Sequence, residues 1–169
     1  MHIHDGDFEI GRSCDRPAMR DPYIHEKFTR TQRGVMLMAS NVEATKKGYE
    51  NFQKGDIPTL IRDLLDDGCT WISPGPPGKL PWAGTFKGKQ EIATFFTRVD
   101  ENLEFSEFAP REMIEQGDTV VVLGTLSGRA KKTGKAVANE WAHVFKYSQG
   151  KVVFFQEYID TAADVLAMS

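Results

Sequence analysis

The residues best suited to chemistry lie in the last forty positions of the chain. Two alternating apolar runs, 138–147 and 152–160, flank Gln149-Gly150, a pair typical of a two-residue hairpin turn. Such a turn places residues whose numbers sum to 299 opposite each other, with alternate pairs on one face. The pairs on the face of interest are Asn139 with Asp160, Trp141 with Tyr158, His143 with Gln156, and Phe145 with Phe154. A face that mixes aromatic and polar side chains in this way is typical of a pocket wall.

Asp160 is the candidate for acid–base chemistry. A carboxylate that removes a proton beside a carbonyl and returns it needs a pKa near neutrality, and burial against Trp141, Tyr158 and Trp82 would raise it from about 3.9. The competing hypothesis is that Asp160 caps a short helix expected at 161–167, which would lower its pKa instead. One residue could do both.

His143 and Tyr158 are the candidates for polarising a carbonyl oxygen. The expected register puts His143 four residues from Asp160, or about 13 Å along the strand, so the two cannot form a hydrogen bond unless a bulge intervenes. They would act together only on a ligand that reaches both. The alternative for His143 is a structural hydrogen bond to Gln156 in a polar layer of the core.

Further aromatic and polar side chains are expected to complete the pocket. Trp82 follows the stiff Pro- and Gly-rich segment 74–81 at the expected pocket mouth. Aromatic residues at helical spacing are more often core, and core packing is the favoured interpretation for Phe95 and Phe96. The residues expected to bind a ligand are Trp82, Trp141, Trp71, Asn139, Gln156, Phe96 and Tyr49.

The elements that must position these residues begin at Asn41, a good N-cap for a helix that ends before Gly55. Asp56 caps a second helix that is expected to reach Asp67-Gly68. The remaining elements are a strand at 69–73, a helix at 88–103, and strands at 104–115, 119–130, 138–147 and 152–160. Short turns between the last four strands predict an antiparallel meander. Helices followed by strands indicate an α+β fold.

Length and composition favour one domain, 41–169, preceded by an N-terminal extension or arm, 1–40. The net charge of −3 offers no basic field for nucleic acid, and no apolar run approaches the roughly 18 residues of a membrane span. With two cysteines and no signal-peptide pattern, the protein is expected to be cytoplasmic. His2 and His4 lie near Asp5 and Asp7, but we expect neither a metal site there nor a cofactor.

Two segments carry a resemblance to a known family: residues 80–88 (LPWAGTFKG), before the third helix, and residues 158–162 (YIDTA), at the end. With the order of elements, they resemble the SnoaL-like polyketide cyclases of the ketosteroid isomerase and nuclear transport factor 2 (NTF2) superfamily. The resemblance covers 41–169. It implies a cystatin-like, cone-shaped fold, in which a curved antiparallel sheet wraps around about three helices and leaves an apolar pocket open at one end. It also implies a homodimer through the sheet's outer face, and makes Asp160 the general acid and base.

Departures from the relatives narrow the function. Ser73 stands before Pro74, where ketosteroid isomerases carry their catalytic Asp, and Tyr49 only approximates the helix-one Tyr of those enzymes. The final hairpin lacks the Arg of limonene epoxide hydrolases. The leading hypothesis is a cofactor-independent cyclase or isomerase that uses Asp160 on a hydrophobic carbonyl compound. The alternatives are a non-catalytic binder of a hydrophobic or aromatic molecule, and an interaction module with a filled core.

Overall fold

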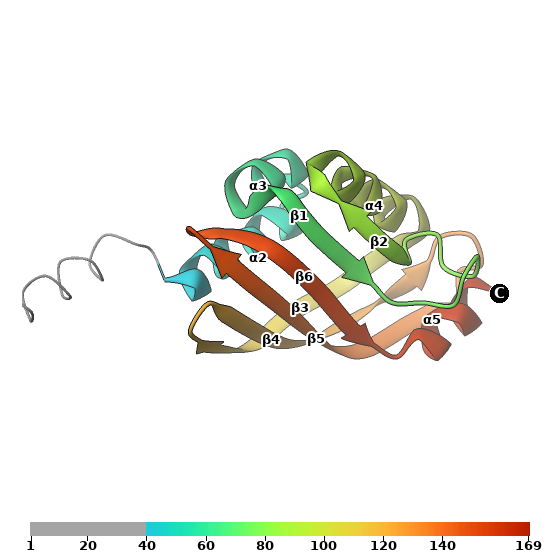
Figure 1. Ribbon diagram of the computed structural model, residues 1–169. Coiled ribbons are helices and arrows are strands. Elements are labelled where there is room, and N and C mark those ends of the chain that lie inside the picture. The colour runs from blue at the N-terminus through green and yellow to red at the C-terminus, as the bar shows by residue number, and fades with distance from the viewer. Residues whose placement is uncertain (1–39) are drawn as a thin grey trace, which may run out of the picture. The chain divides into compact units, whose positions relative to one another are not determined.

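Residues 40–169 are described by a computed structural model, in which helices lie against one face of a six-stranded sheet (Figure 1). The helices are α2 (Asn41–Gln53), α3 (Ile57–Leu64), α4 (Gly88–Asn102) and α5 (Thr161–Met168). The strands are β1 (Leu65–Ser73), β2 (Gly84–Lys87), β3 (Leu103–Gln116), β4 (Thr119–Ala130), β5 (Ala136–Ser148) and β6 (Lys151–Ile159). No helix in this part of the chain is long and apolar enough to cross a membrane.

Short polar side chains begin the first two helices. The Ser40 side chain accepts a hydrogen bond from the backbone N–H of Glu43, so the N-cap of α2 is Ser40 and not the expected Asn41. Asp56 caps α3 as predicted, accepting from the N–H of Thr59. The prediction that this helix reaches Asp67-Gly68 is wrong, because Leu65 already has an extended backbone and starts β1.

The sheet has the order β2-β1-β6-β5-β4-β3. The antiparallel meander of β3 to β6 is as predicted, with Gln149-Gly150 as its last turn. Strand β1 pairs in parallel with β6, which makes the sheet mixed, and the short β2, which was not predicted, covers the other edge of β1. The α+β fold, with its N-terminal helices against a curved sheet, is confirmed.

A β-bulge changes the predicted register of the final hairpin. Next to the turn, Tyr147 pairs with Val152, so the numbers sum to 299; beyond it, Lys146 pairs with Phe154, and the sum becomes 300. Val153 is the extra residue. A single unpaired residue turns every later side chain of the strand to the opposite face. The partner of His143 is therefore Glu157 and not Gln156.

Candidate functional site

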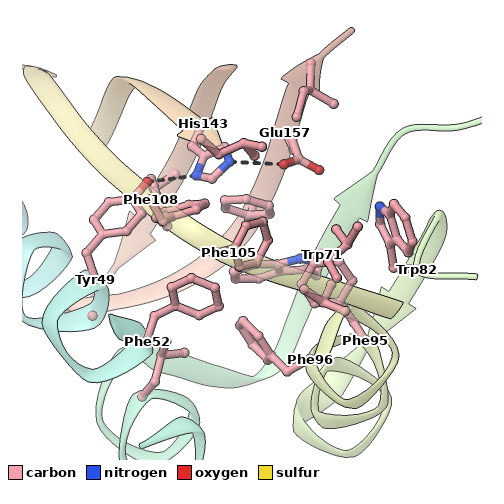
Figure 2. A pocket seen from close by; sticks show the side chains of 18 of the residues that line it. Tyr49, Phe52, Trp71, Trp82, Phe95, Phe96, Phe105, Phe108, His143 and Glu157 are labelled. Carbon is pink, nitrogen blue, oxygen red and sulfur yellow. Dashed lines mark hydrogen bonds and ion pairs between the residues drawn. The ribbon is translucent and has the colours of Figure 1, made fainter. Parts of the chain in front are cut away.

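An apolar cavity of about 90 Å³ lies between the helices and the sheet face that they cover. About half of its lining residues are aromatic, and Figure 2 shows side chains of α2, β1, α4, β5 and β6 around it. Few of the lining side chains carry polar groups. Those that do are Thr45, Tyr49, Trp71, Trp82, His143, Glu157 and Asp164.

Four side chains from four elements form a hydrogen-bonded chain beside the cavity. The Tyr49 hydroxyl lies 2.8 Å from His143 Nδ1, and His143 Nε2 lies 3.3 Å from Glu157 Oε1 (Figure 2). The Ser73 hydroxyl donates to Glu157 Oε2 over 2.9 Å. Ser73 thus holds a carboxylate that the neighbouring strand supplies.

Burial keeps the tyrosine of this chain protonated. Loss of water, and then the charge of Glu157, raise the pKa of Tyr49 well above its ordinary value, so Tyr49 keeps its proton. When Tyr49 donates to Nδ1, His143 is neutral and carries its hydrogen on Nε2, where it donates to Glu157. Both ring nitrogens of His143 are then engaged within the protein.

Aromatic stacking fixes the His143 ring. The Trp141 ring lies 4.1 Å from the His143 ring at an interplanar angle of 23°, and Phe108 stacks on Trp141 at 5.0 Å. Gly124 lies opposite Trp141 on β4. Because glycine has no side chain, the indole of Trp141 occupies the space that a Cβ atom would fill. The imidazole therefore cannot turn without moving this stack.

Asp164 is a second carboxyl group at the cavity. It lies in the first turn of α5, is only 3% exposed, and accepts a hydrogen bond of 2.8 Å from Asn139 Nδ2. Burial, followed by the charges of Glu157 and Asp160, raises its pKa from 3.8 to about 6, against the opposing effect of Asn139. A carboxyl group with this pKa can both take up and release a proton near neutral pH.

The residues expected to act in catalysis have separate surroundings. His143 lines the cavity. Asp160 is exposed and caps α5, accepting from the N–H of Ala162, so the capping hypothesis describes its contacts. Tyr158 is 53% exposed, because the bulge turns it and Gln156 away from the face of His143. The expected pairs of Trp141 with Tyr158 and of Phe145 with Phe154 are likewise wrong by one residue, because Trp141 pairs with Ile159 and Phe145 with Phe155.

The residues expected to bind a ligand divide in a similar way. Four of them line the cavity: Trp71, Trp82, Phe96 and Tyr49. Trp141 stacks on His143, and Asn139 reaches the cavity only through Asp164. Phe95 is buried in the core, as expected, and it also lines the cavity.

Glu157 and Asp164 are the residues that sequence reasoning missed. Glu157 was assigned to the opposite face by register, and a one-residue bulge after the turn would have been needed to find it. Asp164 lies four residues after Asp160, about one helical turn further along α5, and that spacing was the available signal. His2, His4, Asp5 and Asp7 lie outside the described residues.

Removing one hydroxyl group tests the hydrogen-bonded chain. Tyr49→Phe keeps the ring but leaves buried His143 Nδ1 without its partner, so we expect a loss of about 1–2 kcal/mol in the free energy of unfolding. Urea unfolding would measure it. Lys54→Ala, at the exposed end of α2, is the control and should change little. A Tyr49→Phe protein as stable as the control would contradict the assignment.

The chain is similar to proteins of known structure. An NTF2-like protein of unknown function from Burkholderia pseudomallei K96243 is 30% identical, with a TM-score of 0.69 over 78% of this chain and 99% of that one. One from Burkholderia xenovorans LB400 is 30% identical, with a TM-score of 0.70 over 79% and 99%. TerC, co-crystallised with polyporic acid, is 30% identical, with a TM-score of 0.69 over 77% and 98%. No curated protein matches the chain.

The fold, with its N-terminal helices and six-stranded curved sheet, is that of the NTF2-like class. Within that class, the model of the SnoaL-like domain matches residues 46–155. The chain belongs to the SnoaL-like domain family.

Proposed function

We propose that the protein is a cofactor-independent enzyme of the isomerase or cyclase type, which transfers a proton at the carbon next to a carbonyl group of a hydrophobic small molecule. The observation that carries the proposal is Asp164, a carboxyl group with a pKa of about 6 in an aromatic cavity that also holds the His143–Glu157 pair. Carboxyl groups whose surroundings move their pKa toward neutrality are a common basis of acid–base catalysis.

In this proposal, Asp164 takes the place that the sequence suggested for Asp160. Ionised Asp164 removes a proton from the carbon, and the electron pair moves into the carbonyl to give an enolate. The same carboxyl group returns the proton to another carbon for isomerisation, or the enolate carbon attacks a second carbonyl for ring closure. Asp160 caps α5 and raises the pKa of Asp164 through its charge.

The hydrogen-bonded chain of Tyr49, His143, Glu157 and Ser73 has a positioning role. It satisfies the polar groups of one cavity wall, and it keeps the Glu157 charge in place, where that charge raises the pKa of Asp164. A fixed charge costs no reorganisation during reaction. The co-crystallisation of TerC, which is 30% identical, with polyporic acid supports the binding of an organic small molecule by this protein.

Hydrogen–deuterium exchange tests the function without knowledge of the natural substrate. 2-Tetralone, an aromatic ring fused to a cyclic ketone, carries exchangeable protons next to its carbonyl. In deuterated buffer, we expect the wild-type protein to speed their exchange at least 100-fold over buffer, with a rate that rises with pH through about 6 as Asp164 ionises. Proton NMR of the ketone would follow the loss of signal.

The rival function is binding without catalysis, which the apolar lining also permits. If the NMR signals of 2-tetralone broaden or shift when the protein is added, but its protons exchange no faster than in buffer between pH 5 and 9, the rival is correct.

The homodimer stays a prediction. It would use the outer sheet face, where Leu123, Ala142 and Tyr158 lie side by side, and sedimentation equilibrium would test it.

A further inference from the structure

The indole N–H of Trp71 is a buried donor at the cavity with no acceptor among residues 40–169. The side chain is 6% exposed and belongs to the cavity lining, and Figure 2 shows its nitrogen among the rings that surround the cavity. Buried polar groups in folded proteins nearly always have partners. An unpartnered donor in a cavity wall therefore points to a ligand atom that accepts a hydrogen bond.

The direction of this donor is fixed by packing. The Trp71 ring stacks on Phe155 with a centroid distance of 3.6 Å and an interplanar angle of 17°. Phe95 and Phe96 contact it at 5.6 and 5.4 Å. Because the ring is held on several sides, a ligand that meets the N–H need not order the side chain first, which favours binding.

Trp71 is also the better candidate donor for a carbonyl oxygen than the residues expected from the sequence. Both nitrogens of His143 already meet partners, Tyr49 and Glu157. Tyr158 lies on the other face of the sheet. Trp141 likewise has an unpartnered buried N–H among the described residues, but it does not belong to the cavity lining.

The charges around the cavity restrict the ligand further. Glu157 and Asp164 are acidic, and the described lining contains neither Lys nor Arg. A carboxylate or phosphate group would lose its water and meet like charge without a cation to compensate it. The many aromatic side chains favour a flat ring system.

We infer that the ligand is an uncharged aromatic carbonyl compound whose carbonyl oxygen accepts a hydrogen bond from Trp71 Nε1. This rests on the proposed function for the carbonyl group itself. Trp71 then touches the oxygen on which negative charge develops when Asp164 removes the proton, and the strengthening of that hydrogen bond stabilises the enolate. The same contact discriminates against hydrocarbons of equal shape.

Three small probes of nearly equal shape separate these contributions. Acetophenone has the carbonyl, α-methylstyrene has a CH₂ group in place of the oxygen, and benzoate carries a negative charge. By isothermal titration calorimetry at pH 7.5, we expect the wild-type protein to bind acetophenone at least fivefold more tightly than either of the others. Equal affinity for α-methylstyrene would overturn the hydrogen bond, equal affinity for benzoate would overturn the uncharged class, and no binding by any probe at millimolar concentration would overturn both.

Two substitutions locate the donor. In Trp71→Phe, the preference for acetophenone over α-methylstyrene should fall below twofold, while Trp141→Phe, which removes the other unpartnered indole, should keep it. If Trp71→Phe does not fold, 3-(3-benzothienyl)alanine at position 71 keeps the shape and removes only the N–H. A preference that survives this replacement would overturn the assignment.

The outcomes separate this inference from the proposed function, because binding is measured without turnover. Probe preference that depends on Trp71, without exchange of 2-tetralone, would support the ligand class and reject the enzyme. Exchange of 2-tetralone without any probe preference would do the reverse.

Discussion

Asp164→Asn should slow the exchange of 2-tetralone by about 10²- to 10⁴-fold, the usual contribution of a general base. Asparagine has nearly the same shape and keeps an oxygen that can accept from Asn139, but it cannot take up the proton. NMR exchange rates at pH 7.5 would measure the loss. The control is Asp160→Asn, which removes a carboxylate outside the cavity lining.

The control also decides between the two acids. If Asp160→Asn abolishes exchange and Asp164→Asn does not, then Asp160 is the proton carrier, as the family resemblance suggested. Asp160→Asn should cost less than tenfold in rate, because it removes one of the charges that raise the pKa of Asp164. Its effect on helix capping should be small, since asparagine is also a good N-cap.

The same Asp164→Asn substitution should stabilise the protein above pH 6. The folded-state pKa of Asp164 is raised from 3.8 to about 6, so folding favours the protonated form. The contribution of Asp164 to the free energy of unfolding is fully present below pH 3.8, and it is lost as the pH rises through 6. The loss is about 2–3 kcal/mol, and asparagine avoids it. Urea unfolding at pH 4 and pH 8 should show a small difference from wild type at pH 4 and a more stable variant at pH 8; a variant less stable at pH 8 would contradict the raised pKa.

Gly124→Ala should destabilise the protein by about 3 kcal/mol. A Cβ atom at this position would overlap the six-membered ring of Trp141, which is buried and stacks on both His143 and Phe108. Overpacking in a core costs about 1–3 kcal/mol, and here the ring that must move supports His143, so we place the loss at the upper end. Urea unfolding would measure it.

Gly68→Ala is the matched control, because a Cβ atom there makes only an ordinary contact of 3.5 Å with Asp66 Oδ1. It should change stability by less than about 1 kcal/mol. In a Trp141→Phe background, where the ring is smaller, Gly124→Ala should cost clearly less than it does alone, because the two sites share one contact. Equal costs in both backgrounds would show that Trp141 is not the obstacle.

Local patterns predicted most of this fold. Apolar spacing and the cap at Asp56 located the helices, and the Gly-containing turns separated the four strands of the meander. The parallel pairing of β1 with β6 joins segments far apart in the sequence, which no local pattern encodes. The four-residue β2 follows a Pro-rich segment and is too short for alternation to be visible.

The candidate site was less predictable, for two physical reasons. Strand or helix spacing alone was enough to predict three residues that line the cavity: His143, Tyr49 and Trp71. Glu157 depends on the phase of β6 after an unpaired residue, to which the sequence gives no clear signal. Asp164 depends on where α5 packs, which is a tertiary contact with β4 and β5.

The bulge at Val153 has a consequence for how members of this family are compared. Beyond it, odd-numbered positions of β6 face His143, and without it even-numbered positions would do so. A relative whose β6 has the same length but pairs without the bulge would present the neighbour of the aligned acid to its cavity, and the alignment would show no gap. Equivalent functional groups in such relatives are therefore to be matched by their pairing partners on β5, and a change of chemistry between them requires only a shift of the β5–β6 pairing by one residue.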